Sequence, residues 1–309
     1  LIRAPHVESY KGFVFANMDP DAPPLEEFLG EVGKIGLSFL ANQGEEMEVI
    51  DGVQKFTIGC NWKLAVDNLF DYYHVEVSHG SALVVDFFRR KKSQNANGEE
   101  RRNAAERGRN TNHLVMLGEY GHAIGGPTYD PEQVRSMGLP EQKWRDKPQV
   151  LESMGEVGSQ TNGHPNIFPN LWVTQAGQLS LRLPKGPNKT EIWWFTLLDR
   201  KLPTEEWERL RKLAIHVFGP AGVLEQEDGE NWDQSTRGTQ GVIARRYPLN
   251  FSMGLGHGEM SKDDTGAGHV FTKVNEHAQL WTYRAWADWM AAESWKELKE
   301  RQAPVPDIV

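Results

Sequence analysis

The 309-residue chain contains a single cysteine, Cys60. One thiol cannot form an intrachain disulfide, and it is too few for a zinc or iron–sulfur cluster held by several cysteine thiolates. A disulfide framework and a cysteine-ligated cluster within this chain are therefore both excluded.

Long apolar runs and an excess of positive charge are also lacking. No stretch approaches the roughly 18 apolar residues that a membrane-spanning helix needs. The 34 lysines and arginines are outnumbered by 43 aspartates and glutamates, which gives a net charge of −9, whereas nucleic-acid-binding proteins carry a basic face. We therefore expect neither a membrane nor a nucleic acid as a partner.

The N-terminus shows no targeting signal. The opening Leu1-Ile2-Arg3 lacks an initiator methionine, and it is not part of a cationic and apolar leader or of a transit-peptide composition. We expect a cytoplasmic protein whose sequence is cut from something longer, as a trimmed fragment or a processed product. A chain of this length is typical of two domains, or of one large domain with a sizeable core.

Apolar and aromatic runs separated by turn residues predict antiparallel strands. Residues 168–174 are followed by leucines that alternate with polar residues, then by turn residues at 185–189 and a second apolar run at 191–198. Two such runs around a Gly-Pro-Asn turn are typical of a β-hairpin. Residues 47–58 predict another strand, with a turn at Asp51-Gly52.

Helical periodicity is present in three segments, 62–79, 204–217 and 282–298. Residues 89–110 and 130–162 are polar, with little apolar period, and we expect two long loops there. Hairpins with interspersed helices, rather than strictly alternating strands and helices, indicate the α+β class.

One of the helical segments carries a candidate metal-binding pattern. On a helix, Asn68, Asp71 and His74 are each three residues apart and share one face. His79 follows five residues after His74, roughly 140° further round. Both imidazoles can converge on one ion only if the helix ends, bends or bulges between them, which is frequent at functional sites. Two structural histidines or a zinc site are the alternatives.

A third ligand is expected in the acidic segment 218–232. Two neutral imidazoles and one carboxylate form the open facial triad of non-haem iron(II) centres. The segment contains several carboxylates after the end of a predicted helix. A solvated charged loop is the simpler interpretation of such a cluster.

Two motifs in this order resemble a known family. They are Asn61-Trp62-Lys63 with Asp67-x-x-x-Asp71-x-x-His74-x-x-x-x-His79, and later Phe218-Gly219-Pro220-Ala221-Gly222…Asp228. They resemble the catalytic domain of Rieske non-haem iron aromatic-ring-hydroxylating dioxygenases, in the alpha (large) subunits of the naphthalene, biphenyl and polycyclic-aromatic group. The resemblance covers essentially the whole chain.

The resemblance implies a role for each motif residue. His74, His79 and Asp228 would bind mononuclear iron(II). Asp71 would accept a hydrogen bond from His74 and relay electrons from a Rieske cluster on a neighbouring subunit. Asn68 would lie next to the iron.

Two features of the motifs bear on this assignment. Asp67 stands where the family more often has Glu, at a position that is not a ligand. Glu225, Glu227 and Glu230 stand close to Asp228 and are the alternatives for the third ligand.

An apolar pocket beside the iron is also implied, because neutral arenes bind through apolar area removed from water. Its expected lining is Leu69, Phe70, Val75, Val173, Phe218 and Leu224. Ordinary core packing is the alternative for each of them. If Arg182 points inward, it favours a carboxylated arene, although an arginine on a strand more often faces solvent. His164 could line the pocket or be structural.

The family's [2Fe-2S] Rieske cluster needs two cysteines and two histidines, and Cys60 is not part of such a motif. We expect residues 1–309 to form a single catalytic domain, with the Rieske domain upstream and absent from this chain. The fold that the resemblance implies is a helix-grip (START/Bet v1-like) arrangement, an antiparallel β-sheet wrapped over a long helix.

The implied function is cis-dihydroxylation of an apolar aromatic substrate by O2 at iron(II). Ferredoxin and reductase would supply electrons, and a homotrimer or α3β3 assembly is expected. The alternatives are a Rieske-type monooxygenase or demethylase, a non-catalytic carrier of hydrophobic ligands on the same scaffold, and a zinc hydrolase. The zinc hydrolase ranks last because the chain has no H-E-x-x-H motif.

Overall fold

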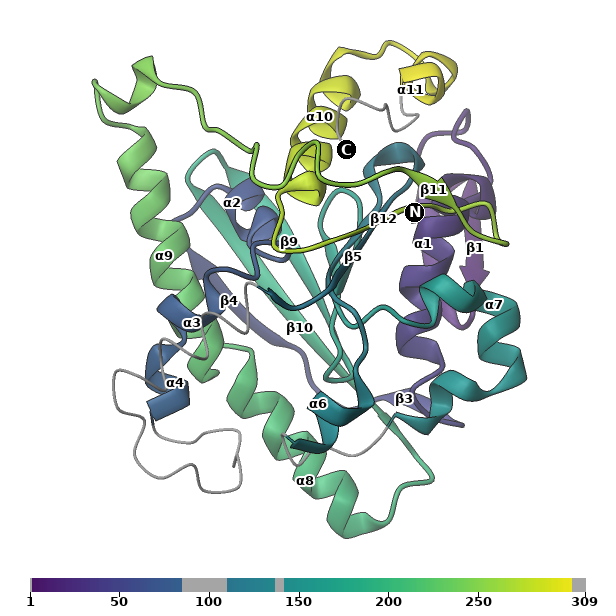
Figure 1. The fold of residues 1–309 in the computed structure, drawn as a ribbon. Coiled ribbons are helices and arrows are strands. Elements are labelled where there is room, and N and C mark those ends of the chain that lie inside the picture. The colour runs from purple at the N-terminus through teal and green to yellow at the C-terminus, as the bar shows by residue number, and fades with distance from the viewer. Residues whose placement is uncertain (1, 85–109, 137–141, 302–309) are drawn as a thin grey trace.

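The computed structural model describes residues 2–84, 110–136 and 142–301, and a large antiparallel sheet forms its centre (Figure 1). Within these residues the sheet has ten strands. Their spatial order is β11 (Ser261–Lys262), β12 (Gly268–Thr272), β5 (His113–Leu117), β6 (Ala123–Pro127), β7 (His164–Ile167), β8 (Leu171–Val173), β9 (Gln178–Gly186), β10 (Lys189–Asp199) and β3 (Met47–Val49), with β4 (Gln54–Ile58) also paired to β10. A separate hairpin is formed by β1 (His6–Tyr10) and β2 (Phe13–Asn17).

Helices surround the sheet. The α-helices are α1 (Leu25–Ala41), α2 (Trp62–Asp67), α3 (Val75–Ser78), α4 (Gly80–Val84), α6 (Pro131–Ser136), α7 (Pro148–Gly158), α8 (Thr204–Val217), α9 (Val223–Thr239), α10 (His277–Ala291) and α11 (Trp295–Arg301). Short 3-10 helices are η1 (Glu119–Gly121), η2 (Lys143–Asp146) and η3 (Ala244–Arg246). The predicted α+β class, with an antiparallel sheet packed on long helices, is confirmed.

The sheet is a middle layer that is buried on both faces. In β5, Leu114 and Met116 belong to the core that α1 and α7 cover, whereas Val115 and Leu117 belong to the core beside α2, α9 and α10. Successive side chains of a strand point to opposite faces, so one strand serves both cores. Figure 1 shows α1 and α7 far from α9 and α2.

The strand predictions hold with one refinement. The predicted hairpin is β9 and β10, in antiparallel register with Trp193 opposite Leu181. The run 47–58 forms β3 and β4, which pair with successive stretches of β10 instead of with each other. The predicted turn is present, and Gly52 has a φ of +98° that favours glycine.

Two helix predictions and one loop prediction need correction. Helix 62–79 ends early, because α2 stops at Asp67 and α3 begins only at Val75. Helix 282–298 is two helices, α10 and α11. The predicted loop 130–162 is wrong, because it contains α6, η2 and α7.

The reason for the last error is a short apolar pattern within a polar stretch. Val150 and Met154, four residues apart on α7, are buried against α1 in one core.

The predicted helix 204–217 is confirmed as α8. The other predicted loop, 89–110, lies almost wholly outside the described residues.

Among the described residues, no helix is long and apolar enough to cross a membrane.

A buried histidine connects three segments of the chain. His122 Nε2 donates to the Phe28 carbonyl of α1 (2.7 Å), and its Nδ1 accepts from the Phe168 backbone N–H (3.0 Å). Both ring nitrogens are used by the neutral imidazole. Burial lowers the pKa of His122 to about 4, although the Phe28 carbonyl opposes this shift.

We therefore expect stability to fall on acidification. The unfolded chain binds a proton at His122 near pH 6.5, and the folded chain resists it until about pH 4. Between these pH values the unfolded chain binds one more proton than the folded chain. The free energy of unfolding therefore falls by on the order of 3 kcal/mol as the pH falls from 6.5 to 4. Urea unfolding should show a shallower pH dependence in His122→Gln than in the wild type, whereas exposed His216→Gln should leave it unchanged. Equal pH dependence in His122→Gln and the wild type would contradict this account.

Candidate metal centre

The first half of the centre is built from turns that follow α2. The Asn61 side chain caps α2 by accepting from the Lys63 N–H (3.1 Å). After the helix ends, Asn68 Nδ2 donates to Asp71 Oδ1 (3.0 Å), and Asp71 Oδ1 lies 2.5 Å from His74 Nδ1. The expected proximity of Asn68, Asp71 and His74 is present, but turns produce it and not one face of a continuous helix.

The two histidines flank the single-turn helix α3. His74 is its N-cap residue and His79 its C-cap residue. The five-residue spacing requires a helix that ends between the two histidines or beside them. Helix α3 meets this requirement because it is a single turn that begins after His74 and ends before His79. The two Nε2 atoms lie 3.2 Å apart.

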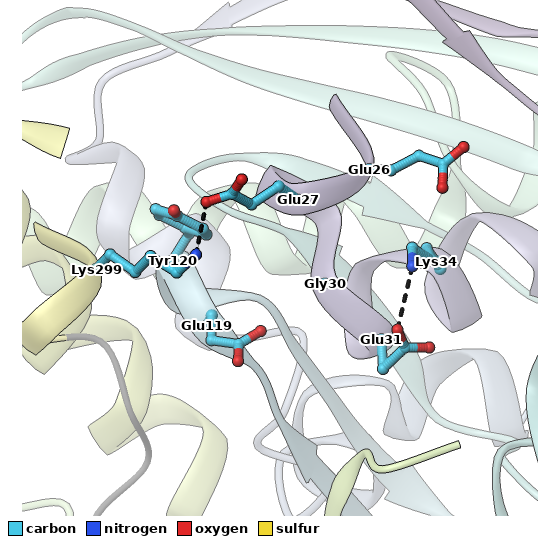
Figure 2. Close-up of a pocket in the computed structure, with 8 residues that line it drawn as sticks. All are labelled: Glu26, Glu27, Gly30, Glu31, Lys34, Glu119, Tyr120 and Lys299. Atoms are coloured by element: carbon cyan, nitrogen blue, oxygen red, sulfur yellow. Dashed lines mark hydrogen bonds and ion pairs between the residues drawn. The ribbon is translucent and has the colours of Figure 1, made fainter. Parts of the chain in front are cut away.

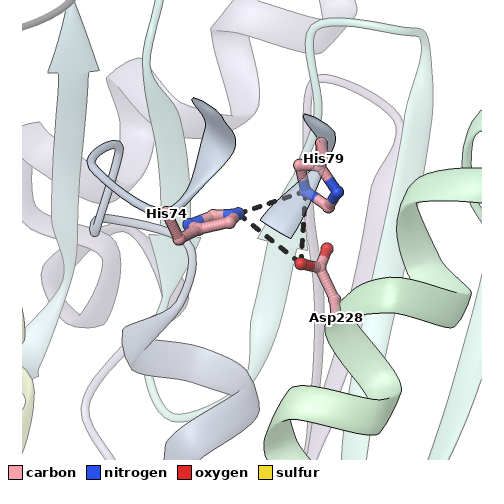
Figure 3. A group of neighbouring side chains, drawn as sticks. All are labelled: His74, His79 and Asp228. Carbon is pink, nitrogen blue, oxygen red and sulfur yellow. Dashed lines mark hydrogen bonds and ion pairs between the residues drawn. The ribbon is translucent and has the colours of Figure 1, made fainter. Parts of the chain in front are cut away.

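Asp228 completes a group of three from the other side, on α9 (Figure 3). Its Oδ1 lies 3.5 Å from His74 Nε2 and 3.2 Å from His79 Nε2. The three candidate ligand atoms lie within 4.8 Å of one another. Residues far apart in the sequence thus converge as the motif predicts.

Each imidazole is fixed from behind by a carboxylate. Since a carboxylate oxygen can only accept, His74 Nδ1 donates to Asp71 and His79 Nδ1 donates to Glu227 Oε2 (2.8 Å). Glu227 also accepts a hydrogen bond from the Ser81 hydroxyl. Both Nε2 atoms are left without a proton and face Asp228. A histidine that binds a metal through Nε2 needs this tautomer.

The donor set fits a divalent cation. Asp228 Oδ1 is buried and has no hydrogen-bond partner among the described residues, and with neutral imidazoles the two facing Nε2 atoms carry lone pairs. Three acceptor atoms facing one another need a positive charge between them. Two imidazoles and one carboxylate are the ligands of non-haem iron(II) centres that keep open coordination positions.

Without a metal, protons take its place. Burial would lower the pKa of His74, but the hydrogen bond and charge of Asp71, together with the charge of Asp228, outweigh it and raise the pKa to about 9. The pKa of His79 is also raised, because Asp228 and Glu227 outweigh its burial. Metal ions and protons therefore compete for the same lone pairs.

The acidic segment is a helix with one buried side, so the interpretation as a solvated loop is wrong. Glu225, Asp228, Trp232 and Thr236 are its buried residues at helical spacing. The spacing of three or four residues can be read from the sequence, and it predicts a helix whose buried face carries polar side chains.

The neighbouring carboxylates have other partners. Glu225 Oε1 accepts from Trp194 Nε1 (3.1 Å), and Glu230 accepts from Gln234 (2.8 Å). Glu227 lies behind His79. Asp228 is therefore the one carboxylate of the four whose oxygen lies near both Nε2 atoms. Asp67 is turned away and accepts from the Tyr283 hydroxyl (2.8 Å).

A cavity of about 200 Å³ adjoins the three candidate ligands. Of the predicted lining, Leu69, Val75, Phe218 and Leu224 are present, together with Asn68. His164, which could line the pocket or be structural, does line it, and three further lining residues were not predicted: Tyr72, Trp172 and Gln175.

Two predicted lining residues lie elsewhere. Val173 belongs to the core on the α1 side of the sheet, and its neighbour Trp172 faces the cavity instead. The alternation of strand side chains already separates these two positions. Phe70 is buried in the core, close to Gly125 of β6.

Arg182 is neither in the cavity nor in solvent. Its side chain is fully buried, and the guanidinium lies 4.5 Å from the Trp172 ring, 5.5 Å from Trp232 and 5.8 Å from Trp194. Burial lowers its pKa to about 10, opposed by the charges of Glu225 and Asp228. The hypothesis that Arg182 recognises a substrate carboxylate is not supported by this position.

A second hollow lies between α1, η1 and α11 (Figure 2). Its volume is about 350 Å³, but its side chains are arranged as surface ion pairs. Lys299 pairs with Glu27 (2.6 Å) and Lys34 with Glu31 (3.1 Å). Although larger, it has no convergent ligand set like that of His74, His79 and Asp228 among the described residues.

The fold and these side chains define a candidate mononuclear metal centre in an α+β fold, with an adjoining small cavity. Residues 43–292 match the family model described as "Ring hydroxylating alpha subunit (catalytic domain)". The chain belongs to this family.

Relatives by sequence match nearly the whole chain. Biphenyl 2,3-dioxygenase subunit alpha of Rhodococcus jostii (strain RHA1) is 30% identical over 313 residues, which cover 97% of this chain and 65% of the relative. Biphenyl dioxygenase subunit alpha of Metapseudomonas furukawaii is 32% identical over 304 residues, with coverage of 95% and 64%. The chain thus spans slightly less than two thirds of these relatives' length.

Solved structures agree in fold. Naphthalene 1,2-dioxygenase from Rhodococcus sp. bound to indole has a TM-score of 0.72 at 26% identity, with 94% of this chain and 67% of that chain covered. A naphthalene 1,2-dioxygenase with indole bound in the active site has a TM-score of 0.75 at 23% identity, with coverage of 97% and 67%.

The carboxylate behind His79 gives a prediction about metal affinity. Glu227→Gln replaces a charged acceptor by a neutral one, so the His79 imidazole becomes less basic and less well oriented. We expect affinity for Fe(II) or Co(II) to fall by about 10- to 100-fold in a competition titration with a chelator.

Glu230→Gln is the matched control, because Glu230 is three residues further along α9 and is bonded to Gln234. Its metal affinity should equal that of the wild type. Unchanged affinity in Glu227→Gln would show that Glu227 does not act on the centre.

Proposed function

We propose that this chain is the catalytic part of a ring-hydroxylating dioxygenase that adds both atoms of O2 to an aromatic ring and forms a cis-dihydrodiol. The observation that carries the proposal is the group His74, His79 and Asp228 beside a small, largely apolar cavity. The names of the biphenyl and benzene dioxygenase relatives support it.

In this proposal iron(II), held by His74, His79 and Asp228, supplies the activation of oxygen. The chain's own residues prepare the site. Asp71 and Glu227 hold the Nδ1 protons and orient the two rings. Leu69, Val75, Trp172, Phe218 and Leu224 exclude water and position the arene by apolar contact.

Electron delivery is assigned to Asp71. Its carboxyl lies between Asn68 and His74, and burial raises its pKa in opposition to the His74 hydrogen bond. We assign to Asp71 the link through which electrons from a Rieske [2Fe-2S] cluster on a neighbouring subunit reach the centre.

The proposal includes the surroundings of the enzyme. Ferredoxin and reductase pass on electrons from NAD(P)H, the subunits assemble as a homotrimer or α3β3, and the Rieske domain lies upstream of residues 1–309. The proposal also assigns the protein to the cytoplasm.

Oxygen labelling tests the reaction on the chain alone. Hydrogen peroxide is equivalent to O2 together with two electrons and two protons. One arene and one H2O2 therefore contain all the atoms of the dihydrodiol, and no other electron donor is needed. The iron-loaded chain with naphthalene and H2(18)O2 should give a diol with two labelled oxygens. One labelled oxygen in the product indicates a monooxygenase. Release of formaldehyde from 2-methoxynaphthalene in a parallel reaction indicates a demethylase, and failure to bind stoichiometric iron indicates a carrier.

The role of Asp71 gives a separate prediction. Asp71→Asn keeps an acceptor for His74 Nδ1 but removes the charge, so iron should remain bound at saturating concentration. We expect turnover driven by NAD(P)H, ferredoxin and reductase to fall by at least about 100-fold in the assembled enzyme, while peroxide-driven turnover changes far less.

Glu230→Gln is again the control and should retain both activities. Full NAD(P)H-driven activity in Asp71→Asn would defeat the relay assignment. Equal losses in both assays would assign Asp71 to orientation of His74 alone.

A further inference from the structure

The cavity beside the candidate ligands has a polar part that the proposed reaction does not use. We propose that Tyr72 and His164 select an arene that carries a hydroxyl group. This inference rests on the proposed function and narrows its substrate class.

His164 presents a hydrogen-bond acceptor to the cavity. The residue opens β7 and lines the cavity. Its Nδ1 lies 2.9 Å from the Leu69 carbonyl oxygen, which can only accept, so the ring proton is on Nδ1. Burial, opposed by the Leu69 carbonyl, lowers the pKa of His164 to about 4, so the ring is neutral near pH 7. No hydrogen bond from the described residues reaches Nε2, which is therefore left as an acceptor.

Tyr72 presents a hydroxyl. Its side chain lines the same cavity, and its Oη is buried without a hydrogen-bond partner among the described residues. The ring lies beside that of His164, with centroids 5.2 Å apart. Burial raises the pKa of Tyr72, and the Gln175 side chain, which also lines the cavity, opposes this shift as a weak hydrogen-bonding neighbour of the Tyr72 hydroxyl.

The chain makes room for Tyr72 at a specific glycine. A Cβ at Gly126 would lie 2.4 Å from Tyr72 Cε2, and Gly126 has a φ of +136°. The ring is therefore seated against β6 at a position that only glycine allows. A phenol hydroxyl both donates and accepts, so a tyrosine placed in this way, with Gln175 as its only weak partner among the described residues, keeps the capacity to pair with a ligand.

A hydroxyl group fits this pair better than other substituents. It can donate to His164 Nε2 and accept from Tyr72 Oη at the same time, whereas a carboxylate can only accept. Among the described residues, no lysine or arginine lines the cavity, and Arg182 is enclosed by tryptophans. A volume of about 200 Å³ is below the roughly 300–1,000 Å³ of drug-sized sites, which limits the arene to one or two rings.

The test compares 2-naphthol with naphthalene, which differ by one hydroxyl. Dissociation constants are measured by calorimetry on the metal-free and the zinc-loaded chain. The wild type should prefer 2-naphthol in both forms, and Tyr72→Phe should reduce that preference by about three- to tenfold without weakening naphthalene. Val75→Ala, which removes apolar contact, should weaken both ligands alike.

Equal binding of the two ligands, or an unchanged preference in Tyr72→Phe, would overturn the inference. If Tyr72→Phe keeps the preference for 2-naphthol and only the zinc-loaded chain shows it, the hydroxyl of 2-naphthol binds the metal and not Tyr72. The measurement uses no turnover, so its failure is distinguishable from a failure of the labelling experiment, which tests the reaction itself.

Discussion

The hydrogen bonds that Asp71 and Glu227 accept from the two imidazoles decide what this centre can do. Each fixes the proton on Nδ1 and turns Nε2 toward Asp228. If either ring flipped, a proton would stand where a lone pair is needed, and the three-atom group would no longer attract a cation. The two carboxylates come from different elements, one from the turn before α3 and one from α9. The centre therefore exists only when α9 is docked.

Docking of α9 depends on buried polar contacts. Glu225 accepts from Trp194 on β10, and Arg182 on β9 lies among three tryptophans with its positive charge acting on Glu225 and Asp228. A charge enclosed in this way is costly unless opposite charge lies close. The arginine thus couples the sheet to the helix that carries the third candidate ligand, and Trp172 connects the same group to the cavity wall.

Local patterns in the sequence predicted the local features of the fold. The β9–β10 hairpin and helix α8 follow from apolar period and turn residues, and the family motifs pointed to His74, His79 and Asp228. The error at 130–162 came from a short buried pattern within a polar stretch. Val173 was misassigned although strand alternation separates it from Trp172. Glu227 was named only as an alternative third ligand. The roles of Glu227 and Tyr72 could not have been found this way, because they depend on tertiary contacts with His79 and Gly126.

Anomalous diffraction at the iron edge, from crystals of the iron-loaded chain, tests the central claim most directly. The account predicts one peak bound by Nε2 of His74, Nε2 of His79 and the Asp228 carboxylate, with both Nδ1 atoms still bonded to Asp71 and Glu227. A peak ligated through Nδ1, or by Glu225 or Glu227 in place of Asp228, would contradict it.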